Sequence, residues 1–238
     1  METIRQERQT IFMPLPMTTR GEYQENIVNA LGDRRMALEC ALGQLAEQAT
    51  VLTEVAMQLV ETLRTGHKVL VAGNGGSAAE AQHFVTELVG RFKKEREPYA
   101  ALALTSDTAA LTAIANDYGY QDVFARQVLA LGLPGDLLIA FSTSGESENL
   151  LQAALASHKR LMTVVAITGE RHSRLENLAD LTVRVPVTDT AIAQELHMVL
   201  THLLCDITES QLTAPASKRI SKRRREANLA SSETTKEE

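Results

Sequence analysis

The sequence predicts an α/β protein with a doubly wound parallel sheet flanked by helices. Two observations carry this prediction. After residue 68, short apolar runs alternate with segments of helical composition, which indicates parallel strands joined by helical crossovers. The first run, Val69 to Ala72, leads directly into a glycine turn and then a helix. Ligands gather at the carboxyl ends of the strands in such folds, so we expect a site there.

The segment before the first strand, Tyr23 to Leu63, has a helical composition. Its apolar residues alternate steps of four and three: Leu38, Leu42, Leu45, Ala49, Leu52, Ala56, Leu59 and Leu63. A helix or helical hairpin packed on the body explains this stripe, and so does a seam between subunits. Gly43 is a candidate point of division into two helices.

The later elements follow in alternation. We expect strands over residues 99–104, 136–141, 162–168 and 181–185. We expect helical segments over residues 108–115, 120–131, 148–158, 173–178 and 192–209. The domain prediction is a flexible arm over residues 1–22, one sheet domain with its N-terminal helices over 23–211, and a basic, disordered tail over 212–238.

Composition narrows the function classes. The chain has 238 residues, of which 44% are hydrophobic and 23% charged, as in soluble globular proteins. Aromatic residues make up 4% and Trp is absent, which argues against a base-stacking surface. Residues 212–238 hold seven Lys/Arg and four Asp/Glu, which leaves 17 basic and 26 acidic residues in the body. Nucleic acid is therefore an unlikely partner, except through a contact of the tail with an acidic molecule.

The two cysteines, Cys40 and Cys205, are far apart and lack CxxC spacing. They indicate neither a disulfide framework nor a thiolate zinc site. No apolar run approaches membrane-spanning length, and the first residues lack an apolar leader segment. We therefore expect a cytoplasmic location and no membrane partner.

The glycine turn, Gly73-Asn74-Gly75-Gly76-Ser77, can bring backbone N–H groups close to a ligand. A strand, such a turn and a helix start together suit a phosphate at the positive end of the helix. The turn matches neither the dinucleotide nor the P-loop pattern. A glycine turn without a ligand is also common in α/β proteins.

The helix after this turn carries His83, Glu87 and Arg91 at intervals of four, so these side chains share one face. His and Glu in this arrangement could bind a metal or move protons. A solvated ion pair on the helix surface would also explain the spacing.

A second polar loop, Ser142-Thr143-Ser144-Gly145-Glu146-Ser147, follows the strand expected at 136–141. Its four hydroxyls supply neutral donors suited to a phosphate that must be released again. A simple helix N-cap would explain one of these hydroxyls, because one is enough for a cap.

The last helix carries Gln194, Glu195, His197 and His202 within an apolar run. Gln194 and His202 are eight residues apart and can face one cleft two turns apart. His197 is also a candidate, and helix geometry alone does not choose between the two histidines. A lone histidine in such a run is more often a hydrogen-bonded core residue.

Four segments in order, GNGGSAAEAQHFVTELVGR, AIANDYG, STSGES and QELHMVLTH, resemble the bacterial phosphoheptose isomerases, which are built on the SIS domain. The resemblance spans about residues 23 to 211. It implies isomerisation of the ketose sedoheptulose 7-phosphate to the aldose D-glycero-D-manno-heptose 7-phosphate, through an enediolate, for nucleotide-activated heptose biosynthesis. It also implies a homotetramer with active sites built across subunits.

The resemblance also implies roles for individual residues. One zinc ion per subunit would be held by His83, Glu87, Gln194 and His202. Glu87 and His202 would carry the proton transfers. The sugar phosphate would contact Asn74, Gly75, Gly76, Glu87, Asn116, Asp117, Ser142, Thr143, Ser144, Ser147 and Gln194.

A second family with the same fold competes with this interpretation. The regulator that associates with the bacterial replication initiator is similar to this chain over AQHF and LTAIAND. That regulator typically lacks counterparts of Glu87 and His202, and their presence here favours an enzyme. A non-catalytic phosphosugar-binding module would also fit the fold, and so would an SIS enzyme that acts on another phosphosugar.

Overall fold

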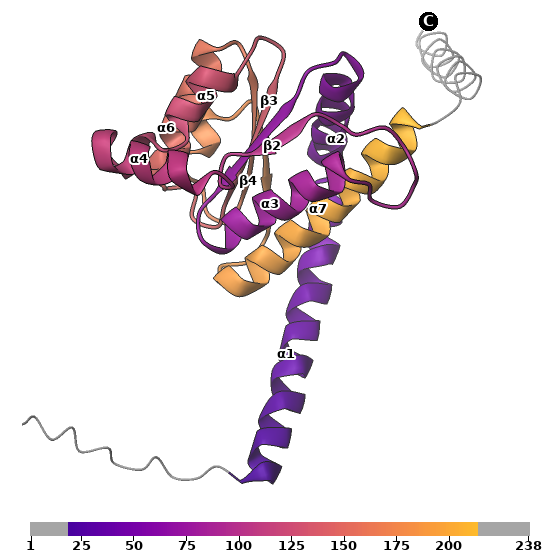
Figure 1. Ribbon diagram of the computed structural model, residues 1–238. Helices are drawn as coiled ribbons and strands as arrows, with labels where there is room; N and C mark the ends of the chain where they lie inside the picture. The colour runs from indigo at the N-terminus through magenta and orange to yellow at the C-terminus, as the bar shows by residue number, and fades with distance from the viewer. Residues whose placement is uncertain (1–18, 214–238) are drawn as a thin grey trace, which may run out of the picture.

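The computed structural model of the protein describes residues 19–213. Its centre is a five-stranded parallel sheet with the strand order β2-β1-β3-β4-β5 (Figure 1). The strands are β1 (Val69–Gly73), β2 (Ala101–Ala103), β3 (Leu137–Ser142), β4 (Thr163–Thr168) and β5 (Leu181–Arg184). The predicted doubly wound parallel sheet is confirmed.

The winding direction reverses between β1 and β3. The chain passes from β1 to β2 on one side, then returns to β3 on the other side of β1. Val71 of β1 pairs with Ala103 of β2 and with Ile139 of β3. The carboxyl ends of β1 and β3 therefore lie side by side at a topological switch point, where α/β folds bind their ligands.

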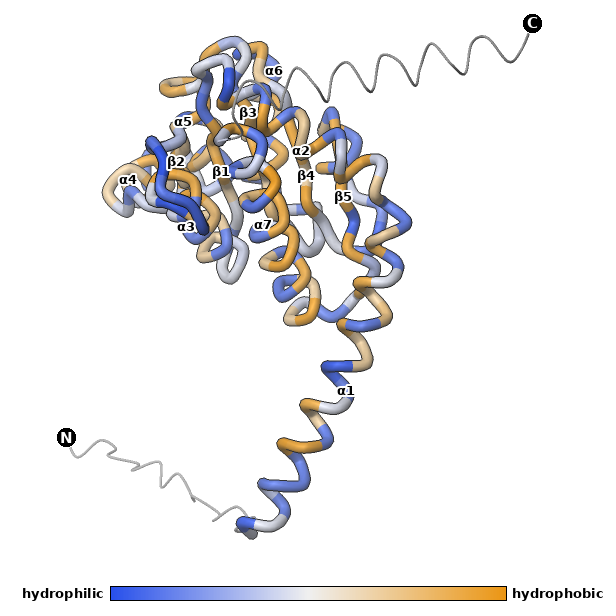
Figure 2. Tube along the Cα trace, turned by 90° about the vertical axis from the view of Figure 1, so that its right-hand side faces the viewer, coloured by the Kyte–Doolittle hydropathy of each residue, from blue (hydrophilic) through white to orange (hydrophobic). Residues whose placement is uncertain are grey.

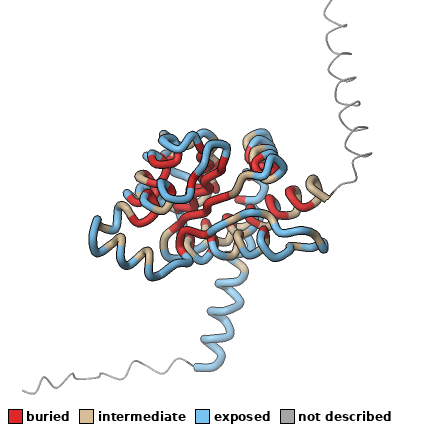
Figure 3. The backbone as a smooth tube through the Cα atoms, turned by 45° about the horizontal axis from the view of Figure 1, so that its top comes forward, coloured by how far each residue is buried: buried red, intermediate tan, exposed pale blue. Residues whose placement is uncertain are grey.

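Helices cover both faces of the sheet, and each face has its own apolar cluster. One face carries α2 (Ala49–Arg64), α3 (Gly76–Val89) and α7 (Thr190–Leu212). The other carries α4 (Thr108–Tyr118), α5 (Ala125–Leu131) and α6 (Glu148–Lys159). Both faces of β1 are fully buried, which explains its continuous apolar sequence (Figure 3).

Three of the helical predictions differ from the structure in the following bounds. The helix expected over 120–131 is divided into the 3-10 turn η1 (Tyr120–Asp122) and α5. The turn expected over 173–178 contracts to η2 (Glu176–Leu178). α7 begins at Thr190 rather than 192, because the Asp189 side chain accepts a hydrogen bond from the Ile192 N–H and caps the helix.

The first helix, α1 (Arg20–Glu47), begins three residues before the expected domain start. Thr19 and Glu22 form a reciprocal capping box, whose T-x-x-E pattern is visible in the sequence. α1 meets α2 at Gln48 and not at Gly43, which lies inside α1. Most of α1 extends away from the sheet rather than folding back along α2 (Figures 1 and 2).

The expected N-terminal arm up to residue 18, and the basic tail from residue 214, lie outside the described residues. Among the helices of residues 19–213, none combines the length and apolarity that a membrane span requires.

Candidate functional site

α3 and α7 lie side by side on one face of the sheet and run in the same direction (Figure 1). Gly76 at the start of α3 contacts Gln194, His83 contacts His202, and Phe92, just beyond the end of α3, contacts Glu209. We call this contact region the α3–α7 seam. It carries all four of the predicted catalytic and metal-binding residues.

Three of the four predicted metal ligands meet at the seam. The Nε2 atoms of His83 and His202 are 3.0 Å apart, and His83 Nε2 is 3.4 Å from Glu87 Oε1. One ligand atom from each of the three residues lies within 4.8 Å of the others. All three side chains are partly accessible to solvent.

This donor set fits a divalent transition metal. Imidazole nitrogen and carboxylate oxygen are ordinary zinc ligands, with bonds of about 2.0–2.2 Å. Two such ligands at tetrahedral angles are about 3.3 Å apart, close to the two separations measured here. Three protein ligands with one open position are typical of catalytic zinc sites.

Gln194, the fourth predicted ligand, lies elsewhere on the seam. Its amide occupies the space where a Cβ on Gly76 would fall, 2.3 Å from Gln194 Nε2. Gly76 is seven residues before His83, about two helical turns along α3. Within one chain, Gln194 therefore lies beside the glycine turn rather than beside the three other predicted ligands.

The ambiguity between the two histidines of α7 is resolved by burial. His197 is fully buried, and its Nε2 is 3.3 Å from the Thr168 carbonyl oxygen. Its Nδ1 faces the buried carboxylate of Glu80 at 3.5 Å. His197 is therefore a core residue that joins α7 to α3 and β4, while His202 faces the candidate site.

The two predicted phosphate loops end in helix starts without side-chain caps. Gly75 precedes α3 with a φ of 58°, a conformation that favours glycine. Ser147 is the N-cap residue of α6, yet its side chain makes no capping hydrogen bond. The simple N-cap explanation for the Ser/Thr loop therefore fails for Ser147.

A cavity of about 550 Å³ lies between these two loops, lined by Asn74, Tyr120, Gln121, Ser147, Glu148 and Asn149. The side-chain amides of Asn74 and Asn149 exchange two hydrogen bonds, of 2.9 and 2.8 Å. The Tyr120 hydroxyl donates to Asn74 Oδ1 at 3.1 Å. Sequence reasoning identified Asn74 and Ser147 but missed Tyr120, Gln121, Glu148 and Asn149. The signal available for Asn149 was its place in the sequence, at the second position of the expected helix and two residues after Ser147.

The other predicted substrate contacts do not line this cavity. Ser142 Oγ accepts a hydrogen bond from the Gly145 N–H, and Ser144 Oγ accepts one from the Glu146 N–H. These bonds hold the Ser/Thr loop, in which Thr143 is half-buried. A separate exposed pair lies at the end of α4, where Asn116 Nδ2 donates to Asp117 Oδ1.

The loop after α3 contacts the three-residue cluster through Phe92. The Phe92 ring stacks on the His202 imidazole, with centroids 5.5 Å apart and planes inclined by 21°. Arg91, predicted to share a face with His83 and Glu87, instead pairs with Glu95 at an exposed position. Beneath the cluster, burial raises the pKa of the Cys205 thiol to about 12, and the negative charge of Glu87 contributes to this rise.

Known proteins resemble this chain in both sequence and fold. The SIS domain family matches residues 37–169. A phosphoheptose isomerase of Thiobacillus denitrificans is 53% identical over 160 residues, which cover 66% of this chain and 81% of the relative. A phosphoheptose isomerase of Rhodospirillum rubrum is 44% identical over 176 residues, which cover 74% of this chain and 93% of the relative.

Solved structures agree with these relatives. The structure of a phosphoheptose isomerase from Francisella tularensis superposes with a TM-score of 0.73 at 38% identity, covering 81% of this chain and 98% of that one. The Neisseria gonorrhoeae phosphoheptose isomerase gives a TM-score of 0.72 at 40% identity, covering 79% and 99%. With its sheet, its glycine and Ser/Thr loops and its seam, this chain belongs to the phosphoheptose isomerase family of SIS-domain proteins.

Proposed function

We propose that this protein isomerises sedoheptulose 7-phosphate to D-glycero-D-manno-heptose 7-phosphate, in the cytoplasm, for nucleotide-activated heptose biosynthesis. One structural observation supports the proposal independently of the names of the related proteins. Glu87, a proton acceptor, and His202, a proton donor, lie within 4.8 Å of each other beside His83, although they are 115 residues apart in the sequence. A ketose–aldose isomerase needs such a pair to move a proton between neighbouring carbons.

The phosphate is expected at the cavity between the glycine and Ser/Thr loops. Backbone N–H groups at the starts of α3 and α6 and the Ser147 hydroxyl would hold it by neutral hydrogen bonds. Anchoring the far end of the substrate in this way fixes the position of the reacting carbons. In this proposal the cavity binds the phosphate of the substrate, and side chains of the α3–α7 seam carry out the proton transfers.

We propose that His83, Glu87 and His202 hold one zinc ion, with Gln194 as the fourth ligand only after its side chain moves away from Gly76. Bound zinc would polarise the substrate oxygens and stabilise developing negative charge. Glu87 would take the proton from C1 and return it to C2, while His202 would pass the proton of the O1 hydroxyl to O2. A carboxylate that also binds metal is a weaker base, so the two roles of Glu87 compete.

The direct test is incubation of the purified protein with sedoheptulose 7-phosphate, followed by NMR detection of the aldoheptose phosphate. Product formation that is lost in Glu87→Gln supports the proposal. A folded wild-type protein that binds the sugar phosphate but forms no aldose would overturn it. Turnover of a different phosphosugar alone would keep the reaction type and reject the substrate.

We also propose a homotetramer with sites completed across subunits. The support is α1, whose Tyr23, Ile27 and Leu31 are 58–65% exposed at intervals of four. Such a row of apolar side chains on an extended helix suits a helix–helix contact between copies. Light scattering at micromolar concentration should give four times the chain mass, and a monomeric mass would reject the assembly.

A replication-regulating adaptor is the second candidate function. Its support is the similarity over AQHF and LTAIAND, and the assembled Glu87 and His202 argue against it. Capture of the initiator protein from solution, without turnover of a sugar phosphate, would favour the adaptor.

A further inference from the structure

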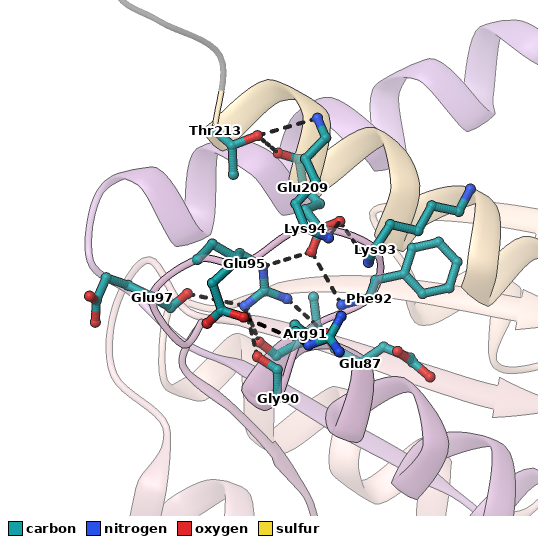
Figure 4. Close-up of polar contacts among 12 residues, drawn as sticks. Glu87, Gly90, Arg91, Phe92, Lys93, Lys94, Glu95, Glu97, Glu209 and Thr213 are labelled. Atoms are coloured by element: carbon teal, nitrogen blue, oxygen red, sulfur yellow. Dashed lines mark hydrogen bonds and ion pairs between the residues drawn. The ribbon is translucent and has the colours of Figure 1, made fainter.

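A buried ion pair closes the far end of the α3–α7 seam. Arg96 Nε donates to Glu209 Oε1 at 3.1 Å, and the two side chains are 4% and 2% exposed. Arg96 lies on the loop after α3, and Glu209 lies two turns beyond His202 on α7. We call this pair the Arg96–Glu209 clasp. Figure 4 shows Glu209 and the labelled loop residues around it.

The side-chain carboxylate of Glu209 binds the backbone of the loop after α3. Its Oε2 accepts the N–H groups of Lys93 and Lys94, both at 2.8 Å, and its Oε1 accepts the Phe92 N–H at 3.2 Å. Burial alone would raise the pKa of Glu209, but these three N–H groups and the Arg96 guanidinium together lower the pKa. The carboxylate therefore fixes three consecutive residues, and the first of them is the one that stacks on His202.

Arg96 holds the end of α3 through backbone carbonyls. Its Nη2 donates to the Glu87 carbonyl oxygen at 2.7 Å, and its Nη1 donates to the carbonyls of Leu88 and Gly90. The last turn of a helix leaves its carbonyls without partners inside the helix, so they accept from groups outside it. A cation there also interacts favourably with the negative end of the helix.

We propose that the Arg96–Glu209 clasp is a positioning device for the isomerisation, which sets Glu87 through its backbone and His202 through the Phe92 ring. The inference rests on the proposed function, in which those two residues move the protons. Neither clasp residue lines the phosphate cavity. Loss of the clasp should therefore lower kcat and leave the KM for the sugar phosphate nearly unchanged.

Arg96→Lys is the main test, because it keeps the charge and a contact with Glu209 but removes the fork that reaches Glu87 and Leu88 together. We expect kcat to fall about 10- to 100-fold, the scale of an ångström-sized misplacement, with the KM within about threefold. Phe92→Leu, which removes only the ring over His202, should reproduce part of this loss. The double variant should lose less than the product of the two single effects.

Asp136→Asn is the matched control for a general loss of stability. Asp136 is a buried carboxylate paired with Lys68, and it precedes the central strand β3 and is not part of the α3–α7 seam. The Asp136→Asn variant should melt at a lower temperature than the wild type, and its kcat should stay within about twofold of the wild-type value. Equal kcat losses in Asp136→Asn and Arg96→Lys would overturn the inference, as would an unchanged kcat in folded Arg96→Lys.

A readout independent of activity separates this inference from the proposed function. The His202 ring signal, assigned by its loss in His202→Asn, should carry a ring-current shift from Phe92 in the metal-free protein. That shift should diminish in both Phe92→Leu and Arg96→Lys and persist in Asp136→Asn. If the shift persists in Arg96→Lys, the clasp does not position His202, whether or not the wild type turns over the heptose.

Discussion

The cavity between the loops that follow β1 and β3 differs from the α3–α7 seam in how its polar groups are held. The cavity is lined mostly by neutral groups, among them Asn74, Ser147 and Tyr120, which reach solvent, and Glu148 is the one charged residue among the described residues of its lining. The seam uses charged and ionisable groups, and its Arg96–Glu209 clasp is almost fully buried. A site for a phosphate that comes and goes needs moderate binding, whereas proton transfer needs rigid geometry. Substitutions in each region should separate these two demands.

The largest effect is expected at the seam. Glu87→Gln removes the proton acceptor while keeping the shape of the side chain, so kcat should fall roughly 10²–10⁴-fold. Binding of the sugar phosphate, measured by calorimetry, should persist. The control Glu54→Gln changes an exposed glutamate of α2 and should leave kcat unchanged. Equal kcat values for Glu87→Gln and the wild type would remove Glu87 from the mechanism.

The next effect concerns stability against acid. The pKa of Glu209 is lower in the folded protein than its usual value of 4.5, so the clasp's stabilisation is fully present above pH 4.5 and is lost as the pH falls through the folded pKa. Glu209→Gln leaves Arg96 buried without its partner, at a cost of about 3–5 kcal/mol near pH 7. Urea unfolding should show that the difference in free energy of unfolding between the wild type and Glu209→Gln narrows below pH 4.5. A difference that stays constant from pH 7 to pH 3 would contradict the lowered pKa of Glu209.

A smaller effect is expected where the two regions meet. Gly76→Ala places a methyl group on the Gln194 amide, which must move, so kcat/KM should fall roughly tenfold. Gly43→Ala is the control, since a Cβ there meets no neighbour within 4 Å. It should stabilise α1 by about 0.5–1 kcal/mol without changing kcat/KM. If both alanine variants keep wild-type kinetics, Gln194 has no part in the site.

The smallest effect is a difference in thiol reactivity. Cys205 is buried with its pKa raised to about 12, whereas Cys40 is exposed. At pH 8 a thiol-reactive disulfide reagent should modify Cys40 quickly and Cys205 only after unfolding. Rapid modification of both thiols in the native protein would mean that the seam opens readily.

The sequence predicts the sheet and the chemical groups of the site better than their arrangement. Strand positions follow from apolar runs such as Val69 to Ala72, because a parallel sheet buries both faces of its strands. Helical spacing places His83 and Glu87 on one face, but it cannot choose between His197 and His202. That choice depends on which side of α7 packs against β4.

Contacts between distant residues explain what the sequence could not predict. Arg96 and Glu209 are 113 residues apart and read separately as ordinary surface charges. Gln194 carries the residue type that the resemblance requires, yet its contact with Gly76 depends on how α3 and α7 cross. The start of α1, by contrast, could have been read from Thr19 and Glu22, because a capping box is local.

The sheet is bounded by very short strands, β2 with three residues and β5 with four. Edges this short offer few free backbone groups for an incoming strand, which is a common protection against fibre-like stacking. Growth of the sheet from one molecule into the next is therefore disfavoured at both margins. The homotetramer proposed above would therefore form through helices and not through the edges of the sheet.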